Sequence, residues 1–391
     1  MTTPVRPLYL DYHATTPVDP RALAEMLPFF SERFGNPHSR QHAWGWEADK
    51  AVDAARRRIA ALINANPAEV VFTSGATESN NLAIKGAAER LPDRGRHVVT
   101  VVSEHKSVLD ACTRLERSGF EVTRLAVGPD GLIDLDRLRA AIAPGTILVS
   151  VMAANNEIGT LQPLAEIGAM AHERGALFHT DAAQAAGKIP IDVEAMRIDL
   201  LSLTGHKFYG PKGAGALFVR RRNPKVSLAP QIDGGGQENG LRSGTLNVPG
   251  IVGLGCAAEI CRVEMADESV RLRALRDRLL GGLRSHLDDV RVNGSMDARL
   301  PHNLHVSFGG VEGEALLMAL GDLAVSTGSA CSSGSHAPSH VLQAIGAVGP
   351  QAGASIRFGL GRTTTADEID FAIDRVAAVV TSLRRQTVPS A

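Results

Sequence analysis

The chain has 391 residues, of which 44% are hydrophobic, so it can bury a large core and is neither disordered nor fibrous. Its 41 Lys and Arg residues nearly balance its 42 Asp and Glu residues, and a formal charge of -1 provides no overall field to recruit nucleic acid or an anionic membrane. The four cysteines lack CxxC pairing, no apolar run approaches ~18 residues, and the sequence starts without a leader, which together predict a cytoplasmic protein with no structural metal.

The predicted elements alternate between strands and helices. A helical pattern from about residue 48 to residue 63 precedes an apolar run at 69–72, and later apolar runs are separated by helical segments such as 134–143 and 163–174. Continuous apolar strands of this kind predict an α/β fold with a mostly parallel sheet flanked by helices on both faces. The further strand candidates in this region are 98–102, 122–125, 147–152, 177–179, 200–203 and 216–219.

The pattern changes after Gly250. Residues 251 to about 287 are mostly helical in pattern, and shorter strands follow near 304–308 and 355–358. We therefore expect a large domain over residues 15–259 and a smaller α+β domain made of residues 1–14 and 260–391. The segment Gly253–Ala258 matches the GxGxxA pattern of dinucleotide-binding loops, but it follows no clear strand, so helix packing is the preferred interpretation.

Lys207 and Asp181 each follow a short apolar run, and together they suggest pyridoxal phosphate chemistry. A Schiff-base lysine must be partly desolvated, and the carboxylate must reach the pyridinium nitrogen of the cofactor. Both side chains are expected at one edge of the sheet, because ligands of parallel sheets gather at the carboxyl ends of the strands. A lone lysine is more often a solvated surface group, so the interpretation depends on Thr204 and His206, which can donate to a phosphate.

Three further segments are expected at the same edge. Residues 74–81 lie between a strand and a helix, where backbone N–H groups and the Thr77 hydroxyl can bind a phosphate, although a simple helix cap is an equal alternative. His105 follows the strand at 98–102 and could stack on a cofactor ring, whereas an isolated histidine is more often structural. Asn156 follows the strand at 147–152, where its amide could bind a substrate carboxylate or the cofactor's phenolic oxygen.

Two residues of the C-terminal third are candidates for contact with a substrate. Cys331 lies in the Gly- and Ser-rich stretch 326–336, which predicts a mobile, exposed loop where a thiol can react. Cys256 and Cys261, in contrast, have the apolar helical surroundings of core residues. Arg357 interrupts an apolar strand, where its guanidinium could bind a carboxylate through two hydrogen bonds, and a buried structural ion pair is the alternative.

The motifs that contain these residues resemble those of the pyridoxal-phosphate cysteine desulfurases of the NifS/IscS type, in the class V aminotransferase family, over essentially the full chain. The resembling motifs are Tyr9–Tyr12, Ala14–Pro17, Phe34–Pro37, Thr73–Asn80, Glu104–His105, Asn155–Gly159, Asp181 with Gln184, Gly205–Lys207, Arg242–Thr245 and Gly328–Cys331. The resemblance implies fold type I of the pyridoxal-phosphate enzymes, a homodimer, and conversion of L-cysteine to L-alanine with transfer of sulfur to an acceptor protein such as an iron–sulfur scaffold. The pathway stays open between iron–sulfur clusters, tRNA thiolation, nitrogenase maturation and DNA phosphorothioation. Selenocysteine lyase, or another lyase or aminotransferase on this fold, is the alternative activity.

The resemblance also implies a role for each site residue. Lys207 forms the Schiff base, Asp181 pairs with the ring nitrogen, and Gln184 bonds the phenolic oxygen. His105 stacks on the ring and assists proton transfer, and Cys331 accepts the sulfur as a persulfide. The other cofactor contacts implied are Ala76, Thr77, Asn156, Thr204, His206 and, from the neighbouring subunit, Thr245, while Asn156 and Arg357 bind the cysteine carboxylate. His13, His336 and His340 are unusual for the family, and the sequence indicates no role for them.

Overall fold

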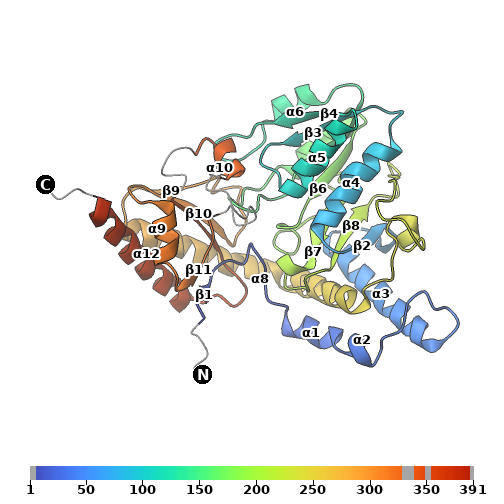
Figure 1. The fold of residues 1–391 in the computed structure, drawn as a ribbon, viewed down its shortest axis with the longest axis horizontal. Helices are drawn as coiled ribbons and strands as arrows, with labels where there is room; N and C mark the ends of the chain where they lie inside the picture. The colour runs from blue at the N-terminus through green and yellow to red at the C-terminus, as the bar shows by residue number, and fades with distance from the viewer. Residues whose placement is uncertain (1–5, 328–338, 348–353, 388–391) are drawn as a thin grey trace.

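The computed structural model describes residues 6–327, 339–347 and 354–387. These residues form a larger part, built on a seven-stranded sheet, and a smaller part, built on a three-stranded sheet (Figure 1). Cys331 and His336 lie outside the described residues.

The sheet of the larger part is mostly parallel. Its strand order is β2-β8-β7-β6-β5-β3-β4. Strand β8 runs in the direction opposite to all the other strands of this sheet. All residues of these strands except those of β4 are buried, as expected for a sheet covered on both faces. The α/β fold predicted from the apolar runs is therefore confirmed. The strands are β2 (Val70–Thr73), β3 (His97–Val101), β4 (Glu121–Leu125), β5 (Thr146–Ser150), β6 (Leu177–Asp181), β7 (Leu200–Thr204) and β8 (Gly215–Val219).

Helices cover both faces of this sheet because alternate strand residues point to opposite sides. Val71, for example, packs in a cluster with α4 (Ala76–Arg90) and α5 (Lys106–Arg117), whereas its neighbour Phe72 packs in the cluster on the other face. That second cluster includes residues of α3 (Ala43–Leu62), α6 (Leu135–Ala141), α7 (Leu164–Glu173) and the N-terminal half of α8 (Val248–His286). Two short helices, α1 (Pro20–Met26) and α2 (Pro28–Ser31), precede α3.

The smaller part has its own core. Its antiparallel sheet has the order β12-β10-β9 and packs against the C-terminal half of α8 and against α12 (Ala366–Thr387). The N-terminal segment also belongs here, because β1 (Leu8–Tyr9) pairs with β11 (Leu323–Ala324). The remaining elements are β9 (Val290–Val292), β10 (Asn303–Phe308), β12 (Ser355–Gly359), α9 (Gly313–Ala319) and α10 (His340–Ala344).

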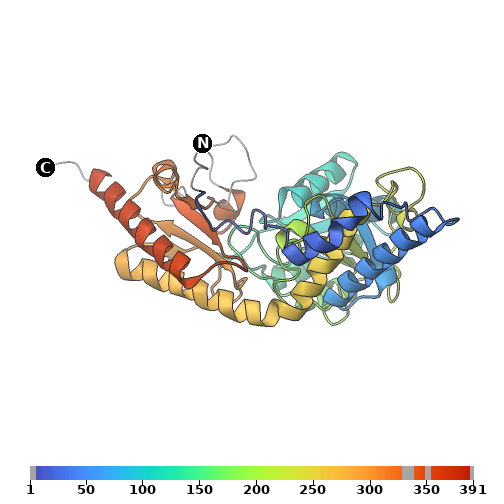
Figure 2. The same cartoon turned by 90° about the horizontal axis from the view of Figure 1, so that it is seen from below.

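The 39-residue helix α8 connects the two parts (Figure 2). Its residues up to Cys261 belong to the core of the larger part, and its residues from Leu272 belong to the core of the smaller part. The predicted boundary near residue 260 falls inside this continuous helix, so the division into domains stays a prediction. The GxGxxA match lies within α8, where a Cβ on Gly255 would be 2.5 Å from the Ala55 Cα of α3, so the helix-packing interpretation is confirmed.

No helix in the described ranges combines the length and the apolar character that crossing a bilayer requires.

Candidate active site

A cavity of about 600 Å³ opens at the carboxyl ends of the parallel strands. Such an edge is where ligands bind in open α/β sheets, because the loops that follow the strands converge there. The predicted site residues that line the cavity are Ala76, Thr77, His105, Asn156, Asp181, Gln184, Thr204, His206, Lys207 and Arg357. Thr245 is exposed and does not line this cavity, and Cys331 lies outside the described residues.

Lys207 lies in a 3₁₀ turn directly after β7. Its Nζ donates to the backbone carbonyls of His13 and Ala14, the latter at 2.8 Å. The N-terminal segment therefore holds the amine at the cavity, although it is distant from Lys207 in sequence.

Asp181 is the last residue of β6 and is 5% exposed. Its Oδ2 accepts a hydrogen bond from Asn80 Nδ2 at 2.7 Å, and its Oδ1 accepts one from the Ala183 N–H at 2.9 Å. These two donors, one on each oxygen, fix the plane of the carboxylate at the wall of the cavity.

The same Asn80 amide is connected to His105 through Ser107. Asn80 Nδ2 donates to Ser107 Oγ at 2.9 Å, and the Ser107 hydroxyl lies 2.8 Å from His105 Nδ1, which also accepts from the Ser107 N–H at 3.2 Å. Because Nδ1 acts as an acceptor, the neutral imidazole of His105 carries its proton on Nε2. Asn80 and Ser107 are site residues that the sequence analysis missed, and the only signal for them was a polar residue on the inner face of a helix.

The N-terminus of α4 also lines the cavity. Gly75 is the N-cap residue of α4, so no side chain caps the first turn, and its φ of 154° suits glycine. The alternative of a simple cap is partly realised, because Glu78 accepts hydrogen bonds from the N–H and the hydroxyl of Ser74. The first turn of α4 nevertheless lines the cavity together with Thr204, and the N–H groups at a helix N-terminus suit an anion.

His206 also lines the cavity, as a neutral imidazole. Burial lowers its pKa to about 4, and the nearby charges of Lys207 and Lys212 act in the same direction. Its Nδ1 lies 3.2 Å from Thr15 Oγ1. A neutral imidazole can donate one hydrogen bond to a phosphate oxygen.

Arg357 enters the cavity from β12 of the smaller sheet and is 3% exposed. Its Nη2 forms an ion pair with Asp11 Oδ1 at 2.7 Å, and its Nη1 donates to the Asn156 carbonyl at 2.8 Å. The buried ion pair that the sequence left open is present, and the guanidinium also lines the cavity, while its binding of a substrate carboxylate stays a prediction. Its Nε has no hydrogen-bond partner among the described residues.

Two buried glutamates, which the sequence places in family-like motifs without a role, lie beside the cavity. Burial raises the pKa of Glu104 well above its usual value, with a further contribution from the charge of Asp181, and the Glu104 carboxyl accepts from the Met152 N–H. Burial also raises the pKa of Glu157 to about 7, and Glu157 accepts from the Ser339 hydroxyl at 2.5 Å. His340 Nε2 donates to the Glu104 carbonyl at 2.9 Å, which gives this histidine a structural contact.

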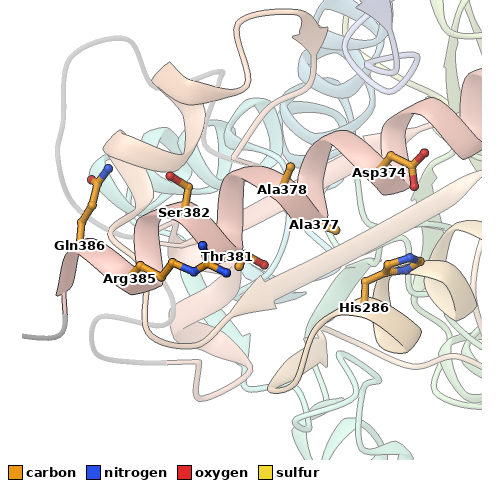
Figure 3. Close-up of a pocket in the computed structure, with 8 residues that line it drawn as sticks. All are labelled: His286, Asp374, Ala377, Ala378, Thr381, Ser382, Arg385 and Gln386. Carbon is orange, nitrogen blue, oxygen red and sulfur yellow. The ribbon is translucent and has the colours of Figure 1, made fainter.

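A second hollow, of about 550 Å³, lies between α12 and the end of α8, remote from the strand ends (Figure 3). It contains none of the predicted site residues. Its lining residues are His286, Asp374, Ala377, Ala378, Thr381, Ser382, Arg385 and Gln386. We assign no chemistry to it.

The donors and acceptors of the main cavity fit pyridoxal phosphate. An amine can hold an aldehyde, a buried carboxylate can pair with a protonated ring nitrogen, and a helix N-terminus flanked by hydroxyl groups can bind a phosphate. Lys207, Asp181 and the start of α4 supply these three groups around one cavity.

Comparisons with known proteins support this assignment. Residues 8–371 match the model of the family described as aminotransferase class-V. A protein of Anaeromyxobacter dehalogenans named cysteine desulfurase IscS is 57% identical over 381 residues, which cover 97% of this chain and 94% of that protein. A protein of the same name from Methylococcus capsulatus is 57% identical over 378 residues, which cover 97% and 93% of the two chains.

Solved structures with the same fold are also similar in sequence. A NifS-like protein superposes with a TM-score of 0.89 at 37% identity, over 96% of this chain and all of that chain. The structure of SspA in complex with cysteine gives a TM-score of 0.80 at 41% identity, over 90% and 98% of the two chains. DndA from Streptomyces lividans gives a TM-score of 0.76 at 42% identity, over 88% and 97%.

Proposed function

The chain belongs to the class V aminotransferase family and is a cysteine desulfurase, and from this premise we propose that it uses pyridoxal phosphate to convert L-cysteine to L-alanine. The observation that carries the proposal is the position of Lys207, Asp181 and His105 around one cavity at the strand ends. These residue types together suit reactions at the α-carbon of an amino acid.

Residues of this chain would hold each end of the cofactor. Lys207 would bind its aldehyde, and Asp181, oriented by Asn80, would pair with the ring nitrogen. When bound, pyridoxal phosphate supplies the electron sink that stabilises negative charge on the substrate's α-carbon. The phosphate contacts would come from Ala76, Thr77, Thr204 and His206 of one subunit and from Thr245 of the other.

Arg357 and Asn156 would bind the carboxylate of L-cysteine. Arg357 lines the cavity, and its ion pair with Asp11 restricts the guanidinium to one orientation. A fixed, buried guanidinium is a strong and directional partner for a carboxylate. The solved complex of SspA with cysteine, at 41% identity, supports cysteine as the ligand of this chain.

Cys331 would accept the sulfur. The described residues on either side of its segment contact the site, since the Ser326 carbonyl accepts from the Arg357 N–H at 2.7 Å and Ser339 donates to Glu157. The thiolate would attack the sulfur of cysteine, the C–S bond would break, and a proton would replace sulfur on the substrate carbon. The products balance as L-alanine and a Cys331 persulfide, which then passes its outer sulfur to an acceptor protein.

Cys331→Ala tests this assignment. The variant should keep its bound cofactor and its visible absorption near ~400 nm, but it should release no sulfide and accumulate no protein-bound sulfane sulfur with saturating L-cysteine. Cys256→Ala is the matched control, because Cys256 is a buried core cysteine and its loss should leave sulfur transfer intact. Alanine and sulfane sulfur formed at wild-type rates by Cys331→Ala would remove Cys331 from the chemistry.

We also propose a cytoplasmic homodimer that delivers sulfur to an acceptor protein such as an iron–sulfur scaffold. Three cysteines of the described ranges, Cys112, Cys256 and Cys261, are free thiols, which agrees with a reducing compartment. Transfer of sulfur-35 from labelled cysteine to purified candidate acceptors would identify the acceptor.

A further inference from the structure

His13 lies fully buried where the two parts of the molecule meet beside the cavity. Its ring stacks on His302 with the centroids 4.4 Å apart, and its carbonyl accepts from Lys207 Nζ. His13 is also one of the residues to which the sequence analysis assigned no role. Its ring nitrogens connect the smaller sheet to Gln184, a residue of the cavity wall.

An arginine determines which groups donate and which accept in these hydrogen bonds. Arg299 Nη1 donates to the side-chain oxygen of Asn303 at 2.7 Å, and a guanidinium can only donate. The Asn303 amide nitrogen must therefore be the group that lies 3.0 Å from the Glu157 carbonyl and 3.1 Å from His13 Nε2. Because an amide nitrogen only donates, His13 Nε2 is an acceptor.

The acceptor role of Nε2 determines which nitrogen of the His13 imidazole carries the proton. Burial lowers the pKa of His13 well below its usual value, so the ring is neutral and its single proton is on Nδ1. Nδ1 then donates to Gln184 Oε1 at 3.0 Å. Gln184 Nε2 donates one hydrogen to the His13 carbonyl at 3.1 Å, which leaves its second N–H for the cavity that Gln184 lines.

We propose that His13 is a positioning residue: held by Asn303 and Arg299, it fixes Gln184 with an amide N–H, and not the amide carbonyl, directed to the cavity. The smaller part thereby sets the polarity of a group in the wall of the larger part. This inference rests on the proposed function, in which Gln184 bonds the phenolic oxygen of pyridoxal phosphate. A carbonyl in that place would repel the oxygen, whereas an N–H attracts it.

Nitrogen-15 NMR of the holoenzyme labelled at histidine tests the direction of the hydrogen bonds. The His13 signals, identified by their loss in His13→Asn, should have the shifts of a neutral imidazole protonated on Nδ1. In Asn303→Asp the donor to Nε2 becomes an acceptor, so the proton should move to Nε2. A His13 ring protonated on Nε2 in the wild-type protein would overturn the proposal.

The visible absorption of the bound cofactor tests the effect on the site. Gln184→Leu should shift the absorption maximum, and His13→Leu should shift it in the same direction. His13→Asn should keep the wild-type maximum, because its amide can donate from the place of Nδ1. If His13→Leu binds no cofactor, Asn303→Asp takes its place, since it reverses the hydrogen bonds without removing the imidazole.

The outcomes distinguish the proposed contact of Gln184 with the cofactor from the proposed positioning role of His13. An unshifted maximum in Gln184→Leu would show that the proposed contact of Gln184 with the cofactor is wrong. A shift in Gln184→Leu with no shift in His13→Leu or Asn303→Asp would leave that contact in place and overturn the role of His13.

Discussion

At the scale of single residues, the cavity is organised by groups that each orient two others. Asn80 donates through one amide nitrogen to both Asp181 and Ser107, and Ser107, whose N–H donates to His105 Nδ1, determines which nitrogen of His105 carries the proton. Shared donors of this kind couple the carboxylate and the imidazole, so a change in one alters the hydrogen bonds available to the other.

Glu157 gives a prediction at this scale. Burial raises its pKa to about 7, above the ordinary 4.5, so between these values the folded chain binds more protons than the unfolded chain. Its contribution to stability is therefore lost as pH rises through about 7, by an amount on the order of 3 kcal/mol. Glu157→Gln cannot ionise, so this loss disappears in the variant. The free energy of unfolding of the variant minus that of wild type, measured with urea, should therefore be larger near pH 8 than near pH 5.

Glu312→Gln is the control for this measurement. Glu312 caps α9, and the N–H groups of Ala315 and Glu314 hold its pKa below the usual value. The stabilising effect of Glu312 is present above its ordinary pKa and is lost only as pH falls. The difference in free energy of unfolding between Glu312→Gln and wild type should therefore not increase from pH 5 to pH 8. Parallel pH profiles for Glu157→Gln and wild type would contradict the prediction.

The residues that face the cavity were predictable because the chemistry restricts their type. An amine and a carboxylate after consecutive strands, as with Lys207 and Asp181, leave few alternatives. The residues that support them were not predictable, because Asn80, Glu157 and His13 take their importance from burial and from partners distant in sequence. No local pattern records such a contact.

At the scale of elements, apolar periodicity identified the long and strongly patterned segments. The helix predicted at 251 to about 287 is α8 (Val248–His286), and the strand at 200–203 is β7 (Leu200–Thr204). The two-residue strands β1 and β11 were missed because a pair so short has no period of its own and exists only through its partner. The antiparallel direction of β8 likewise depends on its connections and not on its composition.

Two glycines of α8 give a prediction at this scale. A Cβ on Gly255 would lie 2.5 Å from the Ala55 Cα, whereas a Cβ on Gly281 would meet no atom within 4 Å. Gly281→Ala should raise the free energy of unfolding by up to about 1 kcal/mol, the difference in helix propensity. Gly255→Ala gains the same propensity but must push α3 away, so we expect a net loss of about 1–3 kcal/mol.

Denaturant unfolding of the two variants, measured side by side, checks this pair. Because both substitutions are the same change in one helix, the difference between them isolates the contact of α8 with α3. Equal effects at Gly255 and Gly281 would mean that α3 yields without cost, contrary to the packing described above.

At the scale of the whole molecule, the exposed apolar side chains are unevenly distributed. Several gather on α1, α2 and the start of α3, where the rings of Phe34 and Trp44 lie 5.0 Å apart. Large apolar patches on a single chain mark interaction surfaces, and a second copy of this chain is the occupant implied by the proposed homodimer. The exposed apolar residues of this segment are Leu23, Leu27, Phe30, Phe34, Trp44 and Trp46.

The double variant Phe30→Glu with Phe34→Glu should therefore convert the protein from a dimer to a monomer, as measured by sedimentation velocity at micromolar concentration. Each glutamate places a charge where the interface would exclude water, and such a charge has no partner there. Met318→Glu is the matched control, because Met318 is 78% exposed on α9 of the smaller part and its substitution should leave the dimer intact.

The monomer should also bind pyridoxal phosphate more weakly, since Thr245 of the second subunit would no longer reach the phosphate. A double variant that stays dimeric would place the interface elsewhere, and a monomer with wild-type cofactor affinity would show that each cavity is complete within one chain.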